Sequence, residues 1–115
     1  MIAFVMAALL GASEPASASL STGDMLPVAS AKLSDCIVYN AVRADDGTSD
    51  VAGLVEGARI SCATKLGIWR YVARAYIVAQ HGAVDTDKIT AGSERSFFDT
   101  VNTKVATLIE AGRKN

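Results

Sequence analysis

The sequence predicts an all-α protein, a small bundle of three to four helices that contains one disulfide-stapled helical hairpin. Three observations predict this fold. Half of the 115 residues are hydrophobic and a fifth are charged, so the chain can bury the core of a single domain. Aromatic residues make up only 6% while alanine is abundant, which favours packed helices over a β-sandwich. Apolar residues also recur at spacings of three and four along most of the chain.

The N-terminus has the pattern of a secretory signal peptide. Residues 2–12 (IAFVMAALLGA) are all apolar or small, Pro15 follows them, and residues 16–18 form the A-x-A pattern that signal peptidases recognise. No Lys or Arg precedes the apolar run, and the alternative interpretation is a buried N-terminal helix. We expect residues 1–18 to be cleaved, leaving a mature protein that begins at Ser19, has no transmembrane segment and is periplasmic or secreted.

The mature chain divides into a leader and one domain. Residues 19–29 (SLSTGDMLPVA) contain turn residues without periodicity, which predicts a flexible leader, and residues 30–115 form a single helical domain. The first helix starts near Ser30, and its apolar stripe comprises Leu33, Cys36, Ile37, Ala41 and Ala44. It ends in the polar run 45–50, where Gly47 suits a left-handed turn. Thr48 or Ser49 is then expected to cap the next helix.

The helical stretch over residues 51–80 is the clearest feature of the sequence. Whether it forms one helix or two is open, and we expect a bend at Gly67, because glycine costs about 1 kcal/mol relative to alanine inside a helix. Gly82 is expected to end the stretch, and a last helix is expected from about Ser93 to Gly112. The apolar stripe of the long stretch comprises Val51, Val55, Ala58, Cys62, Leu66, Trp69, Ala73 and Tyr76, and that of the last helix comprises Phe98, Val101, Val105 and Leu108.

The two cysteines, Cys36 and Cys62, lie on the apolar stripes of adjacent arms of the predicted hairpin. They stand about eleven and about fourteen residues from the turn near Gly47, so their heights differ by only about 4 Å at the rise of an α-helix. We therefore expect a disulfide, worth roughly 3.5 kcal/mol in the loop-entropy model. The alternative is two buried free thiols. Redox catalysis is not expected, since catalytic pairs usually have the spacing C-x-x-C.

The sequence lacks the motifs of common active sites. It contains no G-x-S-x-G nucleophile motif and no glycine-rich phosphate loop. Two cysteines and the single histidine, His81, do not supply the four ligands of a structural zinc site, and the acidic run 45–50 lacks the ligand order of a calcium loop. His81 is interpreted as a polar residue at a helix end beside Gly82. We therefore expect no catalytic residue, no metal and no cofactor.

Arg59, Arg70 and Arg74 fall on one side of a helical projection and are the candidate residues for contact with an anionic partner. The alternative interpretation is a solvated helix face, because Glu56 lies nearby. The formal net charge of -1 gives no general attraction to nucleic acid, so no nucleic-acid partner is expected.

The outline of an export signal, a short mature chain, helices and one disulfide resembles that of periplasmic acid-stress chaperones. The resemblance is one of architecture, and no functional position of that family carries over. We expect a non-enzymatic interaction or binding module of the cell envelope, with a chaperone-like role as one version, that binds a protein or an envelope component. The alternative is a small hydrolase or ligand-binding protein that uses His81 with Asp85 or Asp87. The sequence does not indicate the oligomeric state.

Overall fold

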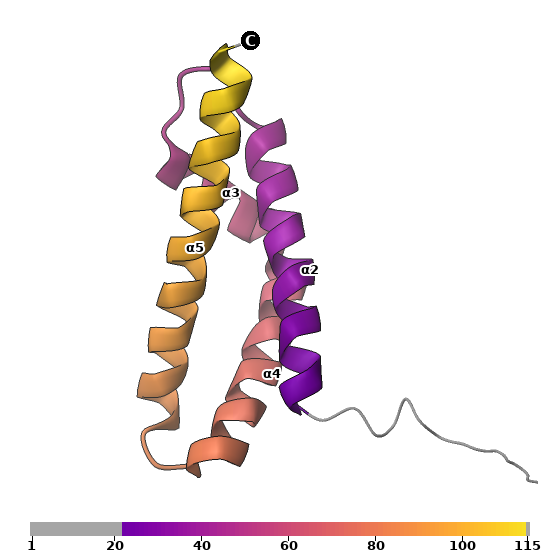
Figure 1. Cartoon of the computed structure of the whole chain (residues 1–115), viewed down its shortest axis with the longest axis vertical. Helices are drawn as coiled ribbons and strands as arrows, with labels where there is room; N and C mark the ends of the chain where they lie inside the picture. The colour runs from indigo at the N-terminus through magenta and orange to yellow at the C-terminus, as the bar shows by residue number, and fades with distance from the viewer. Residues whose placement is uncertain (1–21, 115) are drawn as a thin grey trace, which may run out of the picture.

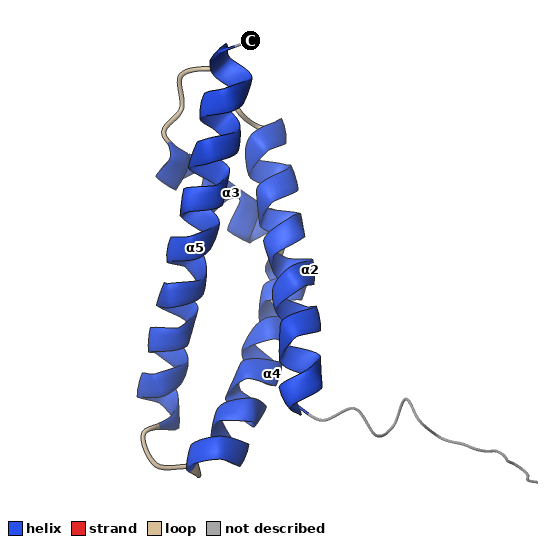
Figure 2. Cartoon of the chain, viewed as in Figure 1, coloured by secondary structure: helices blue, strands red, loops and turns tan. Residues whose placement is uncertain are grey.

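The computed structural model describes residues 22–114, and the predicted signal peptide lies outside the described residues. Within them, four helices and no strand are present: α2 (Thr22–Arg43), α3 (Val51–Ser61), α4 (Ala63–His81) and α5 (Thr86–Lys114) (Figures 1 and 2). Figure 1 shows α2 and α5 running upward and α4 running downward, with the short α3 near the end where α2 and α5 finish. The predicted all-α bundle is confirmed.

The first helix begins at Thr22, eight residues before the predicted start, so the prediction of a flexible leader is wrong for residues 22–29. Its apolar stripe extends further back than Ser30, because Ala29 is buried and Leu26 is partly buried against the core. Pro27 lies inside the helix, where it lacks an N–H and crowds the carbonyl four residues earlier. That carbonyl belongs to the first turn, close to the free end of the helix, where this disruption is tolerated.

The stretch 51–80 forms two helices that meet at Cys62, and the predicted bend at Gly67 is wrong. Cys62 has φ −103° and ψ 22°, and it separates α3 from α4. Gly67 lies within α4, and a Cβ added there would contact nothing within 4 Å. The change of direction at Cys62 follows from packing: α3 lies across one end of the bundle, whereas α4 runs back along α2 (Figure 1).

The polar run between α2 and α3 is a turn held by its own carboxylates. Asp46 accepts hydrogen bonds from the backbone N–H groups of Thr48 and Ser49 at 2.9 and 2.8 Å. Gly47 has φ 89°, as predicted for a left-handed turn. The cap of α3 is Asp50, whose side chain accepts from the N–H of Gly53 at 2.8 Å, and not Thr48 or Ser49 as predicted.

The connection between α4 and α5 is shorter than predicted. Gly82 (φ 77°) ends α4 as expected, but α5 begins at Thr86 and not near Ser93. The hydroxyl of Thr86 donates to the carbonyl oxygen of Gly82 at 3.2 Å, and the residue is only 2% exposed, so it fixes the start of α5 against the end of α4. The helix also continues through Gly112 to Lys114, beyond the predicted end.

One core joins all four helices. Trp69 of α4 is 3% exposed, and its Nε1–H donates to the hydroxyl of Ser30 in α2 at 2.9 Å. The Trp69 ring also lies 5.2 Å from that of Phe97 in α5, which in turn packs edge-on against Phe98. The largest fully buried side chains of this core are Leu33, Ile37, Val101 and Val105. No helix within residues 22–114 combines the length and the apolar character needed to cross a membrane.

Candidate functional site

The predicted disulfide between Cys36 and Cys62 is present, with a Cα–Cα distance of 6.1 Å. It joins the middle of α2 to the corner between α3 and α4. Cys62 is buried at 2% exposure, whereas Cys36 is partly exposed. Asn40, one turn beyond Cys36 on α2, places its Nδ2 donor 3.6 Å from the Cys36 sulfur and 3.5 Å from the Cys62 sulfur. The two sulfurs therefore share one polar neighbour but differ in their access to solvent.

Each of the three candidate arginines binds a carboxylate of α5. Arg70 donates to both carboxylate oxygens of Glu94 at 2.7 Å, and Arg59 reaches one of them at 3.3 Å. Arg74 pairs with Asp87, in the first turn of α5. These arginines, the candidates for contact with an anionic partner, therefore attach α5 to the rest of the bundle.

The electrostatics of Glu94 follow from this arrangement. The hydrogen bonds from Arg70 lower the pKa of Glu94 below its ordinary value, against the opposing effect of burial, and the charge of Arg59 adds to them. The guanidinium of Arg59 also lies 4.1 Å from the ring centroid of Phe98, a cation–π contact that places this arginine over the edge of the core.

A further ion pair fixes the far end of α5. Arg113 donates to both carboxylate oxygens of Asp45 and to the backbone oxygen of Ser49, at 2.8 Å for the latter. The hydrogen bond from Arg113 lowers the pKa of Asp45. Arginine–carboxylate pairs thus hold α5 near its start, in its first half and at its end. The sequence contains no signal for these pairings, because they depend on how α5 packs against the other helices.

Among residues 22–114, no hydrogen bond or ion pair joins His81 to Asp85 or Asp87, the carboxylates of the hydrolase alternative. His81 is the last residue of α4; it is exposed and lines none of five surface hollows formed by the described residues. Asp85 is exposed, and the carboxylate of Asp87 pairs with Arg74. Within the described part of the chain, no three His, Cys, Asp or Glu side chains gather closely enough to hold a metal ion.

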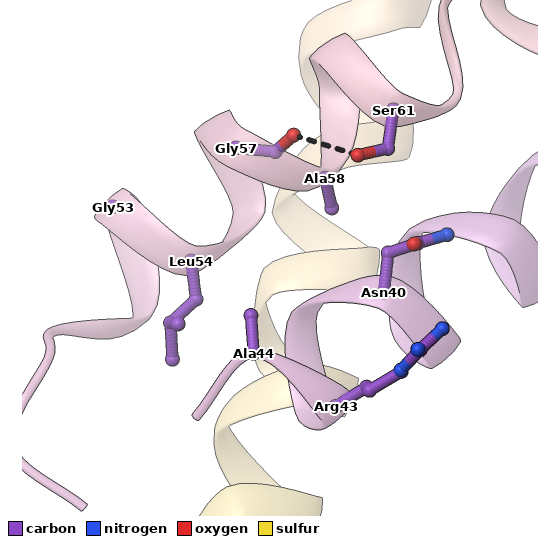
Figure 3. Close-up of a pocket in the computed structure, with 8 residues that line it drawn as sticks. All are labelled: Asn40, Arg43, Ala44, Gly53, Leu54, Gly57, Ala58 and Ser61. Atoms are coloured by element: carbon purple, nitrogen blue, oxygen red, sulfur yellow. Dashed lines mark hydrogen bonds between the residues drawn. The ribbon is translucent and has the colours of Figure 1, made fainter. Parts of the chain in front are cut away.

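A hollow of about 380 Å³ lies between the end of α2 and α3 (Figure 3). Small residues at four-residue spacing, Gly53, Gly57 and Ser61, form its wall on α3, and the Ser61 hydroxyl donates to the carbonyl oxygen of Gly57 at 3.5 Å. Arg43 is the only ionisable side chain among its lining residues, and its guanidinium lies 5.8 Å from the ring centroid of Tyr39. One cation beside small residues supplies neither a nucleophile with its base nor an acid–base pair.

Exposed apolar side chains follow adjacent faces of α2 and α4, which we call the α2/α4 apolar face. It consists of Met25 and Val28 on α2 and of Ile68, Tyr71, Ala75 and Val78 on α4. The α4 members recur at spacings of three and four, so they lie on one side of that helix. Val28 and Ile68 are each 54% exposed and Tyr71 is 76% exposed. Between the helices the face contains a groove of about 250 Å³, also lined by Ala29 and Lys32.

Compared with known proteins, the chain matches no family model, no curated protein and no solved structure.

Proposed function

We propose that the protein is a non-enzymatic, exported binding module of the cell envelope that holds an apolar segment of a protein partner on the α2/α4 apolar face. The observation that carries this proposal is the exposure of Val28, Ile68 and Tyr71 on adjacent helices. Large side chains grouped on one face of a small domain are typical of a surface that binds another protein. The groove between them offers a recess for one apolar side chain of the partner.

The charge beside the groove indicates the chemistry of the segment that is bound. Lys32 lines the groove, and its side chain is exposed. Arg74 lies beside Tyr71 and Val78 at the other end of the face, but Asp87 already pairs with it. An apolar segment with an acidic residue placed near Lys32 would therefore match the face in both polarity and charge.

Two features support export. The apolar run at residues 2–12 with the A-x-A pattern is typical of a signal peptide. The disulfide between Cys36 and Cys62 is of a kind that persists in the periplasm or outside the cell. In such a compartment the natural clients include proteins that are partly unfolded, which display apolar segments of the required kind. A chaperone-like role is the version of the function that we favour.

The test compares two isoleucines. Ile68 belongs to the α2/α4 apolar face, whereas Ile60 lies on α3 outside it and is 74% exposed. We expect the wild-type protein to suppress light scattering when a denatured test enzyme is diluted out of guanidinium chloride. Ile68→Asp should abolish most of this suppression, and Ile60→Asp should retain it, with circular dichroism confirming that both variants are folded. Absence of suppression by the wild type, or equal loss in both variants, would contradict the proposal.

A further inference from the structure

We infer that the disulfide is a site of thiol–disulfide exchange, in which the Cys36 sulfur accepts an anionic thiol and the Cys62 sulfur is the leaving group. The inference rests on the environment of the two sulfurs and is independent of the proposed binding function. Three features of that environment carry it: unequal access, positive charge at the entrance and a donor beside the leaving sulfur.

Access differs between the two cysteines. Cys36 is partly exposed and lines an open hollow of about 440 Å³ between α2 and the start of α4, whereas Cys62 is 2% exposed and does not line it. An attacking thiolate must approach along the S–S axis from outside, and the choice of the attacked sulfur depends on access. The more exposed residue, Cys36, is therefore the one whose sulfur we expect the thiolate to attack.

The entrance of this hollow carries positive charge. Its lining includes Lys32 from α2 and Lys65 from α4, together with a single carboxylate, that of Asp35. Both lysines have exposed side chains. Two ammonium groups against one carboxylate raise the local concentration of an anionic thiol relative to a neutral or cationic one. The hollow also contains Tyr39, which is 62% exposed and offers an apolar surface to the body of the thiol.

The leaving sulfur has a donor in place. The amide Nδ2 of Asn40 lies 3.5 Å from the Cys62 sulfur and is held there by its hydrogen bond to the Cys36 backbone oxygen at 2.9 Å. Cys62 lies between the C-terminal end of α3, which disfavours negative charge, and the N-terminal end of α4, which favours it, so the two helix ends oppose each other there. The Asn40 donor is therefore the feature that stabilises a thiolate at Cys62 against the cost of burial, and a better-stabilised leaving thiolate departs faster.

The step is balanced without an external oxidant. The thiolate RS⁻ forms a bond to the Cys36 sulfur, the bond between the two cysteine sulfurs breaks, and its electron pair remains on Cys62 as the thiolate. The product is a mixed disulfide at Cys36 with one new thiolate at Cys62, so the number of S–S bonds is unchanged. The reverse attack by Cys62 restores the original bridge and releases the thiol.

The experiment uses the oxidised full chain and three thiols as probes: glutathione (anionic), 2-mercaptoethanol (neutral) and cysteamine (cationic). Each reaction is quenched with acid at short times, free thiols are alkylated under denaturing conditions, and the peptides are mapped by mass. We expect glutathione on Cys36 and the alkyl group on Cys62. Glutathione mainly on Cys62, or no opening of the bridge in the folded protein over several hours, would overturn the inference.

Variants separate charge from structure. Lys32→Gln combined with Lys65→Gln should slow the reaction with glutathione by about tenfold and leave that with 2-mercaptoethanol nearly unchanged. Lys104→Gln on the exposed face of α5 is the matched control and should have no effect. Asn40→Leu should slow the reaction with all three thiols by about threefold to fivefold, since it removes the donor. An equal effect of the lysine pair on all three thiols would show that charge at the entrance does not select the thiol, and would overturn that part of the inference.

Discussion

The guanidinium of Arg70 and the carboxylate of Glu94 are joined by two hydrogen bonds of 2.7 Å each, which connect α4 to the first half of α5. Paired hydrogen bonds of this geometry are among the strongest contacts between charged side chains. Arg70 is half-exposed, so solvent screens part of the attraction, while only 18% of the Glu94 side chain is exposed. The pair therefore makes a measurable but moderate contribution to the stability with which α5 packs against α4.

Glu94→Gln is expected to lower the free energy of unfolding at pH 7 by about 1 kcal/mol. The pKa of Glu94 is lowered in the folded protein, mainly by Arg70. The contribution of Glu94 to the free energy of unfolding is therefore fully present above the pKa that a glutamate has in the unfolded chain, about 4.3. It is lost as the pH falls through the lower pKa of Glu94 in the folded protein. Urea titrations from pH 7 down to pH 2 should show the difference between wild type and variant vanishing with acid. Glu110→Gln, which removes an exposed pair with Lys114, is the control and should change little.

Loss of the disulfide is expected to destabilise the fold strongly. Closure of the 26-residue separation between Cys36 and Cys62 restricts the unfolded chain and is worth about 3.5 kcal/mol. Replacement of both cysteines by serine should lower the melting temperature by about 15–25 °C, as followed by circular dichroism. A reductant should lower the melting temperature of the wild type toward that of the variant and leave the variant unaffected. Equal melting temperatures for wild type and variant would contradict the expectation.

Ser30→Ala should destabilise the protein by about 1–2 kcal/mol, because it leaves the buried Nε1–H of Trp69 without its acceptor. Trp69 is the only tryptophan, so its fluorescence follows unfolding in denaturant and also reports on its surroundings. Ser61→Ala is a suitable control, since Ser61 is exposed and makes only a 3.5 Å hydrogen bond within α3. Equal stability of Ser30→Ala and the wild type would show that water satisfies the indole N–H.

Two glycines of α3 are expected to respond oppositely to alanine. Gly57→Ala should stabilise the protein by about 0.5–1 kcal/mol, because its Cβ would meet nothing within 4 Å and alanine favours the helix. A Cβ at Gly53 would lie 2.8 Å from the carboxylate oxygen of Asp50 and would displace the helix cap. The loss of the cap offsets the gain in propensity, so Gly53→Ala should be neutral or destabilising. Thermal unfolding of the two variants side by side tests this difference.

Much of the fold could be predicted because the apolar spacing is regular and the disulfide lies within it. The stripe through Leu33, Ile37 and Ala41 is fully buried, and the pairing of Cys36 with Cys62 follows from helix geometry. Helix boundaries were less predictable, because local preferences were outweighed by packing. Pro27 suggested a leader, yet Leu26 and Ala29 extend the buried stripe of α2 past it. Residues 51–80 divide into two helices at Cys62, where the packing of the bundle requires a change of direction, and not at Gly67, despite the low helix propensity of glycine.

The candidate surfaces were less accessible to sequence reasoning. Arg59, Arg70 and Arg74 were recognised as a strip, but their carboxylate partners lie 13 to 35 residues away in α5. Such distant pairs depend on how one helix packs against another. The exposure of Ile68 and Tyr71 also depends on how the helices pack. Apolar residues at helical spacing predict a buried helix face, but here the neighbouring helices leave one side of α4 uncovered.

The bridge between Cys36 and Cys62 also determines how the molecule would respond to a pulling force applied at its two ends. Tension passes from α2 directly through the sulfur–sulfur bond into α4, so α3 and the turn before it carry no load. The enclosed segment would add roughly 90 Å of contour length if it were free to extend. An intact bridge therefore shortens the extension of the chain by that amount, and a reduced one would release it.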